Sequence, residues 1–348
     1  MIQKKLTDLL KTAPEIQIAD QDKILFLSDL HMGNNKRRDD FKRNSKLFTT
    51  VLRDYYLKQD YRLVLNGDVE ELHKFRLGKI METWSDVFDL FDQFKARGRL
   101  HKMIGNHDYL LSYRQDYRYS ENLHHAIKFI YHSDVFLVFH GHQGTTRFDK
   151  YNTLFGFLLR HIVKPLGLKN LSKALDNEKK YSIEKNIYEF SSKQHIVSII
   201  GHTHRPLFES MSKEDTLKFK IENLVRLYPQ ASEQERQEII IDIEAYKKEL
   251  HRVTESEPTM GSHLYNSTLL IPCIFNSGCV TGKRGITALE IHDGNIYLIY
   301  WYDDRRKQKK VRIYDSGPER LGNSHYKRIV LKHDQLEYVF TRIKLLTQ

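Results

Sequence analysis

Four short apolar runs, each followed by a short segment that contains two or more of Asp, Asn, His and Gly, constrain the fold most strongly. The runs are residues 24–27, 63–65, 135–139 and 196–200. They are rich in branched and aromatic side chains, and short runs of this kind predict buried strands. Because open α/β sheets carry their sites at strand ends, the polar segments that follow are expected to converge. The pattern predicts an α/β protein with one composite site.

The polar segments supply ligands for metal ions. They are Asp29-Leu30-His31, Gly67-Asp68, Gly105-Asn106-His107-Asp108, His140-Gly141-His142 and Gly201-His202-Thr203-His204. Carboxylates combined with imidazoles suit Mn, Fe or Zn, whereas an all-oxygen site would suit Mg or Ca. Any single segment could arise by chance or serve a structural role. The placement of four of them directly after predicted strands favours a metal site.

Together with Ser28, Asn66 and Phe139, these segments resemble the calcineurin-like metallophosphoesterase superfamily over roughly the first 206 residues. The resemblance implies a four-layer α/β/β/α sandwich of two mixed sheets with helical excursions. It also implies that one ion is held by Asp29, His31, Asp68 and His204, and the other by Asp68, Asn106, His140 and His202. Asp68 would bridge the two ions, for which Mn is expected, with Fe or Zn as alternatives.

The same resemblance implies a hydrolytic mechanism. A hydroxide shared by the two ions would attack the phosphorus of a phosphoester substrate. His107 would lie over the phosphate, where it can stabilise the transition state or protonate the leaving oxygen. Asp108 would orient His107. A scaffold that binds metal without catalysis is the distant alternative, and the complete ligand set argues against it.

The remaining histidines have weaker claims. His142 would share a face with His140 if that segment were extended, but we favour a loop position behind the ligands. Structural or surface roles are expected for the histidines outside the segments, which are His73, His101, His124, His125, His132, His161 and His195.

Helical material interrupts the strand pattern. We expect a core at 20–206 that contains a basic, lid-like helical excursion at 147–193. An acidic helical insertion follows at 207–262, where Ser232 and Glu235 have the spacing of a capping box. Closing strands are expected within 263–302, at Leu269-Leu270-Ile271 and from Ile286 to Trp301, with Asp293-Gly294-Asn295 as a hairpin turn. Residues 303–348 are expected to form a basic C-terminal extension.

The distribution of charge along the chain indicates which kinds of partner the protein binds. The net charge is +11, and regions 147–193 and 301–348 together account for all of it. These regions suit an anionic partner, although solvated faces would explain them equally well. In the excursion, Lys combined with Leu and Phe favours peripheral contact with an anionic membrane over a nucleic-acid groove.

No apolar stretch approaches the roughly 20 residues of a membrane helix, and no signal peptide is evident. We expect a cytoplasmic protein, with reduced Cys273 and Cys279 and an oligomeric state that the sequence leaves open.

One branch of the superfamily fits further residues. Residues 28–31 and 201–206, with Asp149 and Tyr151, resemble UDP-2,3-diacylglucosamine pyrophosphatase of lipid A biosynthesis. That branch implies cleavage of a nucleotide-linked lipid to lipid X and UMP at the inner membrane surface, beneath a helical acyl-chain cap. The chain departs from the branch in having His107 for Arg, His142 for Asp and the long insertion after residue 206. A cyclic-nucleotide or other phosphodiesterase or phosphatase of the same superfamily is the alternative.

Overall fold

The computed structural model describes residues 1–145, 173–208, 228–255, 271–306 and 317–347, and positions 217, 221, 224 and 225. The chain divides into two compact units, residues 1–208 with 273–348, and residues 209–272. We describe each unit by itself. Among the described helices, none combines the length and apolar character needed to cross a bilayer.

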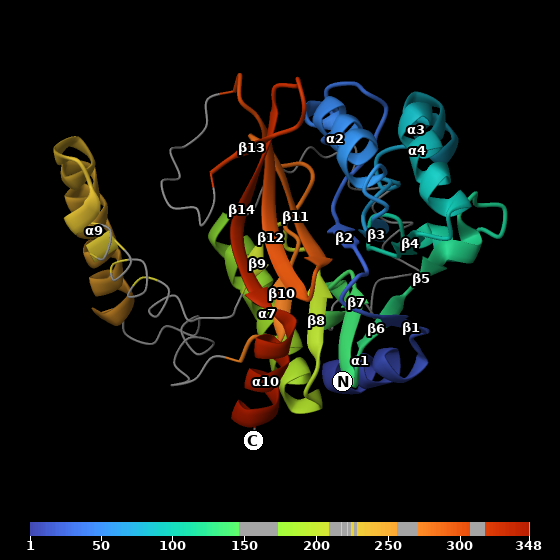
Figure 1. The fold of residues 1–348 in the computed structure, drawn as a ribbon. Coiled ribbons are helices and arrows are strands. Elements are labelled where there is room, and N and C mark those ends of the chain that lie inside the picture. The colour runs from blue at the N-terminus through green and yellow to red at the C-terminus, as the bar shows by residue number, and fades with distance from the viewer. Residues whose placement is uncertain are drawn as a thin grey trace. The chain divides into compact units, whose positions relative to one another are not determined.

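The first unit contains an eight-stranded mixed sheet (Figure 1). Its parallel half is β2 (Ile24–Leu27), β3 (Arg62–Asn66), β4 (Leu100–Met103) and β5 (Leu123–His124). An antiparallel series extends it from β2 through β11 (Gly285–His292), β12 (Asn295–Asp303), β14 (Tyr326–Gln335) and β13 (Glu319–Arg320). Parallel neighbours end at the same edge of the sheet, so the loops after β2, β3 and β4 lie side by side.

A second, six-stranded mixed sheet stands against the first. Its order is β1 (Glu15–Ile18), β6 (Ala126–Tyr131), β7 (Asp134–Phe139), β8 (Val197–Ile200), β10 (Ile274–Asn276) and β9 (Leu207–Phe208). Strands β7, β8 and β10 are parallel. Between the two sheets, Phe26 and Phe129 meet edge to face with ring centroids 6.0 Å apart.

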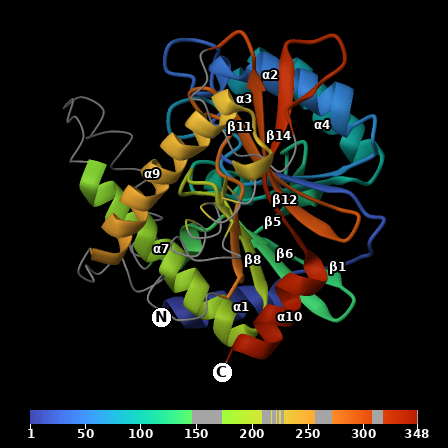
Figure 2. The same ribbon diagram turned by 60° about the vertical axis from the view of Figure 1, so that its left-hand side comes forward.

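Helices cover the outer face of each sheet. On the eight-stranded sheet lie α2 (Ser45–Val51), the π-helical turn Leu52–Tyr56, α3 (Leu77–Thr83) and α4 (Ser85–Ala96) (Figure 1). On the six-stranded sheet lie α1 (Ile2–Thr12) and α7 (Lys173–Gln194), while α10 (Leu336–Leu346) lies at the end of the unit that holds both termini (Figure 2). Layers of apolar side chains such as Phe48 and Ile187 join helices to sheets. The predicted α/β sandwich of two mixed sheets is confirmed.

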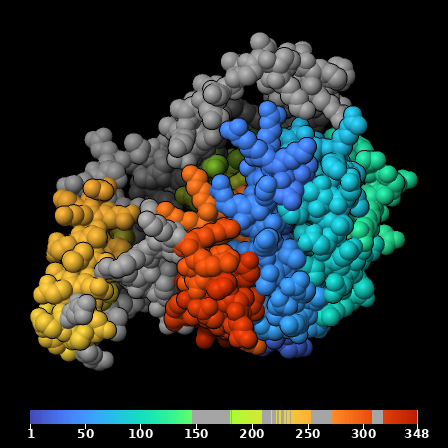
Figure 3. All heavy atoms as spheres, turned by 90° about the horizontal axis from the view of Figure 1, so that it is seen from above, coloured from blue at the N-terminus to red at the C-terminus, as the bar shows by residue number. Residues whose placement is uncertain are grey.

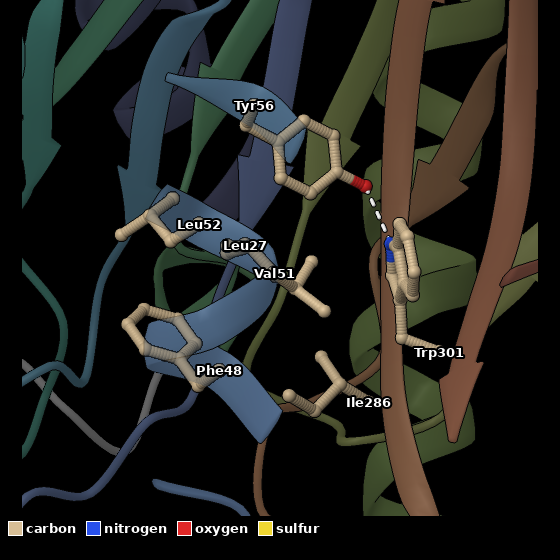
Figure 4. Close-up of a pocket in the computed structure, with 7 residues that line it drawn as sticks. All are labelled: Leu27, Phe48, Val51, Leu52, Tyr56, Ile286 and Trp301. Carbon is tan, nitrogen blue, oxygen red and sulfur yellow. Dashed lines mark hydrogen bonds between the residues drawn. The ribbon is translucent and has the colours of Figure 1, made fainter. Parts of the chain in front are cut away.

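An apolar cavity lies in the core between α2 and the eight-stranded sheet (Figure 4). It is lined by Leu27, Phe48, Val51, Leu52, Tyr56, Ile286 and Trp301. The indole N–H of Trp301 donates to the hydroxyl of Tyr56 at 2.8 Å, and that hydroxyl donates to Glu290 at 2.5 Å. Because these polar atoms bond to one another, we interpret the cavity as a packing gap.

Several local predictions can be compared with the structure. The four apolar runs form β2, β3, β7 and β8. Asp293 and Gly294 both have positive φ, 50° and 67°, and join β11 to β12 as the predicted hairpin turn. The strand expected at 269–271 is wrong at Ile271, because the described strand begins at Ile274; residues 269 and 270 lie outside the described residues.

The segment 303–348, expected as a basic extension, contributes to the core unit. Its strand β14 pairs with β12 from Tyr326 to Gln335, and α10 buries Leu336, Val339, Phe340 and Ile343. The ring of Phe340 lies 4.9 Å from that of Phe136 in β7. This segment therefore closes one edge of the eight-stranded sheet.

The two helical excursions are described in part. Residues 146–172 of the first lie outside the described residues, and so does the greater part of the proposed lid. Its second half is α7, which buries Ile187 and Phe190 against the six-stranded sheet. In the second unit, α9 (Glu233–Glu255) begins after Ser232, whose backbone N–H and hydroxyl both donate to Glu235, at 2.9 and 2.7 Å. This is the predicted capping contact.

Candidate metal centre

The five polar segments converge where strands of both sheets end. The loops after β2, β3 and β4 bring Asp29, Asp68 and Asn106 from one sheet, and the loops after β7 and β8 bring His140 and His202 from the other. Backbone bonds tie the loops together, from Asp29 N to Gly67 O at 3.1 Å and from Gly201 N to His140 O at 2.9 Å. Residues far apart in sequence thus share one site.

Three groups of side chains contain predicted ligands, and within each group the ligand atoms lie within 4.8 Å of one another. They are Asp29 with His31 and His204, Asp68 with His140 and His202, and His31 with Asp68 and His107. The first two groups divide most of the predicted ligands into two neighbouring sets. Such a pair of sets is the arrangement that two adjacent ions require.

The backbone at the predicted ligands adopts a conformation that most residues avoid. The φ angles of Asp29, His31, Asp68, His202 and His204 are 56°, 49°, 53°, 66° and 56°. Left-handed backbone is uncommon for residues other than Gly, and Asp, Asn and His tolerate it best. Strain of this kind is concentrated at functional sites, where the surrounding structure enforces it.

Two glycines in the segments permit close approach between loops. A Cβ on Gly67, where φ is +84°, would come within 2.4 Å of Nδ1 of His140. A Cβ on Gly105 would come within 2.1 Å of Oδ1 of Asp68. Side chains at either position would force the ligand loops apart.

The two buried aspartates divide their oxygens in the same way. In Asp68, Oδ1 accepts the backbone N–H of His107 at 2.8 Å, whereas Oδ2 lies 3.1 Å from Nε2 of His140. In Asp29, Oδ2 accepts the backbone N–H of His202 at 3.0 Å, whereas Oδ1 lies 3.0 Å from Nε2 of His204. One oxygen of each carboxylate therefore fixes a loop, and the other faces the imidazoles.

The donor set fits divalent ions. His140 donates from Nδ1 to the carbonyl of Asn66 at 2.8 Å, which directs Nε2 into the site, as in metal-ligating histidines. Nε2 of His31 and Nε2 of His204 face each other at 3.1 Å. Within the described part of the chain, the buried Oδ1 of Asn106 accepts no hydrogen bond. An ion would supply the partner that this oxygen lacks.

The electrostatics favour a cation beside the two buried carboxylates. Burial would raise the pKa of Asp68, but His140 beside it holds that pKa well below its usual range. Burial likewise opposes charge on His140 and His204, yet Asp68 and Asp29 raise their pKa values to about 9 and about 10. Burial and the charge of His140 lower the pKa of His202 to about 3. Two cations bound here would satisfy the carboxylates and leave the imidazoles neutral.

His107 is oriented by a residue that the sequence analysis did not single out. Its Nδ1 lies 2.9 Å from Oε1 of Glu71, and its Nε2 lies 3.9 Å from Oδ2 of Asp68. Asp108, predicted to orient His107, instead accepts the backbone N–H groups of Gly105 at 2.7 Å and Val69 at 2.8 Å. The carboxylate of Asp108 therefore fixes the conformation of the two loops that carry Gly105 and Val69.

Glu71 lies between two imidazoles. Its Oε2 lies 3.2 Å from Nδ1 of His31, while Oε1 faces His107. Burial would raise the pKa of Glu71, but hydrogen bonds with His107 and His31 hold it well below its ordinary value. In the sequence, the one signal that could have identified Glu71 as a site residue is its position three residues after Asp68.

Other charged residues behind the site were also missed. Lys102 is buried in β4, bonded to Glu70 at 2.5 Å and lying 3.7 Å from Asp108. Burial raises the pKa of Glu70 against the opposing effect of Lys102. On the other side, Glu184 of α7 accepts the hydroxyl of Thr203 at 2.7 Å and pairs with Arg205. No periodicity marks such pairs, because they join separate elements.

Two histidines differ in their relation to the site. His73, expected to be structural or on the surface, lies with its ring centroid 4.5 Å from that of His107 and forms a group with His107 and Glu71. His142 is buried 5.6 Å from His140, ring to ring, and belongs to none of the groups found among the described residues. Burial and the neighbouring His140 hold the pKa of His142 well below its usual value. His161 lies outside the described residues.

Comparisons with known proteins bear on this site. A family model described as calcineurin-like phosphoesterase matches residues 22–228, more than half of the chain. No curated protein matches the chain. Among solved structures, a cold-active protein-tyrosine phosphatase of the psychrophile Shewanella sp. is 12% identical, with 81% of this chain and 78% of that chain covered, at a TM-score of 0.34. The family match, on residues that place Asp and His side chains around a common centre, shows that this chain belongs to the calcineurin-like phosphoesterase family of metal-dependent hydrolases.

Proposed function

We propose that the chain hydrolyses a phosphodiester or pyrophosphate bond with two divalent ions. This proposal rests chiefly on the position of Oδ2 of Asp68, which lies 3.1 Å from Nε2 of His140 and 3.9 Å from Nε2 of His31. This oxygen stands between the two ligand groups and suits a bridging ligand. The first ion would be held by Asp29, His31, Asp68 and His204, and the second by Asp68, Asn106, His140 and His202.

The protein's own side chains have distinct roles in this proposal. Bound divalent ions lower the pKa of a coordinated water and neutralise charge on phosphate oxygens. Glu71 fixes the ring of His107 through Nδ1 at 2.9 Å, so that Nε2 is directed toward the phosphate. From Nε2, His107 donates a proton to the leaving oxygen. Asp108 positions the same loop through Gly105 and Val69.

For the substrate, we propose a nucleotide-linked lipid of the UDP-2,3-diacylglucosamine type. The support is the sequence likeness at residues 201–206 and the basic, apolar character of residues 147–193. Contact with an anionic membrane surface would present such a substrate. A cyclic nucleotide or another phosphodiester is the alternative within the same mechanism.

The test is hydrolysis with Mn, and then with Fe or Zn, of three substrates: UDP-2,3-diacylglucosamine, a cyclic nucleotide and bis(p-nitrophenyl) phosphate. Asp68→Asn should lower metal content and reduce every activity by more than about 100-fold. Asp116→Asn is the matched control, because Asp116 is exposed and pairs with Arg114. Release of UMP far faster than diester cleavage would support the lipid. Metal-dependent cleavage of a diester alone would contradict the lipid proposal and support the dimetal mechanism.

A further inference from the structure

The loop that follows the ligand His31 carries a run of three consecutive exposed cations. We call residues 33–43 the basic loop; it connects His31 to α2 and contains Lys36, Arg37 and Arg38, all exposed. Figure 3 shows the blue N-terminal part of the chain exposed on the face seen from above. Among the described residues, these three side chains make no hydrogen bond or ion pair, whereas Lys74 and Lys102 form ion pairs. Their charge is therefore available to a ligand.

The backbone of the basic loop is held in one conformation by a buried carboxylate. Oδ2 of Asp39 accepts the backbone N–H of Asn35 at 2.6 Å and the indole N–H of Trp84 at 3.1 Å. Its Oδ1 accepts the backbone N–H of Phe41 at 3.1 Å. A Cβ on Gly33 would come within 2.5 Å of the ring of Phe75, so the loop also packs closely at its base. Cations on a preorganised loop bind an anion at a smaller entropic cost.

The base of the basic loop is connected to the proposed catalytic histidine. Asp40 in the loop pairs with Lys74 at 3.3 Å, and Lys74 pairs with Glu71 at 3.2 Å. Glu71 in turn holds His107 at 2.9 Å. Lys36 is only five positions after His31, so their Cα atoms lie at most about 18 Å apart. The three cations thus follow His31 on a short loop that ion pairs connect to Glu71.

We propose that Lys36, Arg37 and Arg38 bind a second phosphate group of the substrate, beyond the one that is hydrolysed. The inference rests on the proposed function and names its substrate class: a molecule with at least two phosphates. Clustered charge of one sign near a site raises the local concentration of an oppositely charged substrate. The second phosphate belongs either to a diphosphate or to the backbone of an oligonucleotide, and the experiment separates the two.

The experiment measures competition with hydrolysis of bis(p-nitrophenyl) phosphate, which has one phosphate. The competitors are UDP-N-acetylglucosamine as a diphosphate, an eight-residue oligothymidylate, and inorganic phosphate as the single-phosphate reference. The wild type is compared with K36Q/R37Q/R38Q. The control is K4Q/K11Q/K193Q, which removes equal charge from exposed positions on α1 and α7. Both variants are first matched by thermal unfolding and metal content.

We expect the loop variant to raise the inhibition constant of one competitor about tenfold or more. The inhibition constant of inorganic phosphate and the KM for bis(p-nitrophenyl) phosphate should change less than about twofold. A selective effect on UDP-N-acetylglucosamine would assign a diphosphate. A selective effect on the oligothymidylate, with a salt slope reduced by about 2, would assign an oligonucleotide.

The inference would be overturned if the loop and control variants behaved alike, or if neither competitor inhibited the wild type. The proposed function fails differently: the wild type would then hydrolyse no bis(p-nitrophenyl) phosphate with Mn, Fe or Zn, before any variant is compared.

Discussion

At the scale of single residues, the site depends on side chains that two or more loops hold in place. Asp29 and Asp68 each use one oxygen for a backbone N–H and present the other to imidazoles. Glu71 places one carboxylate oxygen beside the ring of His31 and the other beside the ring of His107. Because each carboxylate serves both structure and chemistry, substitutions that preserve shape separate the two roles.

Glu71→Gln keeps the shape of the side chain but removes the charge that faces His107. We expect kcat for bis(p-nitrophenyl) phosphate to fall about 10- to 100-fold, because mutation of such an outer partner has effects of that size. The unfolding temperature should change little.

Asp108→Asn is the contrasting variant. Its carboxylate accepts two buried backbone N–H groups near Lys102, so we expect a loss of about 1–3 kcal/mol in unfolding free energy. Equal loss of kcat with unchanged stability in both variants would contradict this division of roles.

His101 predicts a pH dependence of stability away from the metal ligands. Burial, and then the charge of Arg62, lower the pKa of His101 to about 4, and Arg62 donates to its ring at 2.9 Å. The unfolded chain takes up this proton near pH 6.5. The contribution is therefore complete above about pH 6.5 and is lost as the pH falls toward 4.

The check is thermal unfolding of His101→Gln at pH 7 and pH 5. Relative to pH 7, the wild type should lose up to about 2 kcal/mol at pH 5 through this group, and the variant should lose correspondingly less. His325→Gln, at an exposed position, is the control. A parallel fall in wild type and His101→Gln would refute the assignment.

At the scale of elements, α7 joins the helical excursion to the site. Its apolar face packs on the six-stranded sheet through Ile187 and Phe190, and Glu184 on the same helix holds Thr203 and Arg205 in the ligand loop. The helix thus supports the loop that carries His202 and His204.

Ile187→Ala should lower the free energy of unfolding by about 2–5 kcal/mol, because the side chain is fully buried and leaves a cavity. Lys185→Ala on the same helix should change it by less than about 0.5 kcal/mol, since the pair that Lys185 forms among the described residues is a surface pair with Glu189. Denaturant unfolding measures both, and similar losses in the two variants would disprove the packing role.

At the scale of the whole molecule, the first unit is assembled from both ends of the chain. Strand β1 near the N-terminus pairs with β6, and β14 near the C-terminus pairs with β12. The second unit, residues 209–272, is inserted in the sequence between β9 and β10. These two strands pair directly, with Phe208 opposite Phe275.

Replacement of residues 210–271 by a short Gly-Ser turn should therefore leave the first unit folded. The two ends to be joined lie on neighbouring antiparallel strands, which a short turn can connect. We expect one cooperative unfolding transition and metal-dependent hydrolysis of bis(p-nitrophenyl) phosphate within about fivefold of the full chain. Insoluble protein, with the full chain soluble in parallel, would show that the first unit needs the second.

The sequence determined what depends on neighbours along the chain. Apolar runs marked β2, β3, β7 and β8, the Asp293-Gly294 turn marked a hairpin, and Ser232 with Glu235 marked a helix start. The family resemblance then implied two mixed sheets in a sandwich, without the order of their strands. These features are local because hydrophobic period, turn conformation and capping act within a few residues.

Only the tertiary structure decided which charges meet. It placed Glu71 instead of Asp108 against His107, brought His73 beside the same ring, and paired Lys102 with Glu70. It also added β14 to the sheet and gave the ligand residues left-handed backbone. These outcomes depend on which strand ends become neighbours and on how closely their loops approach, and no spacing along a single segment records either.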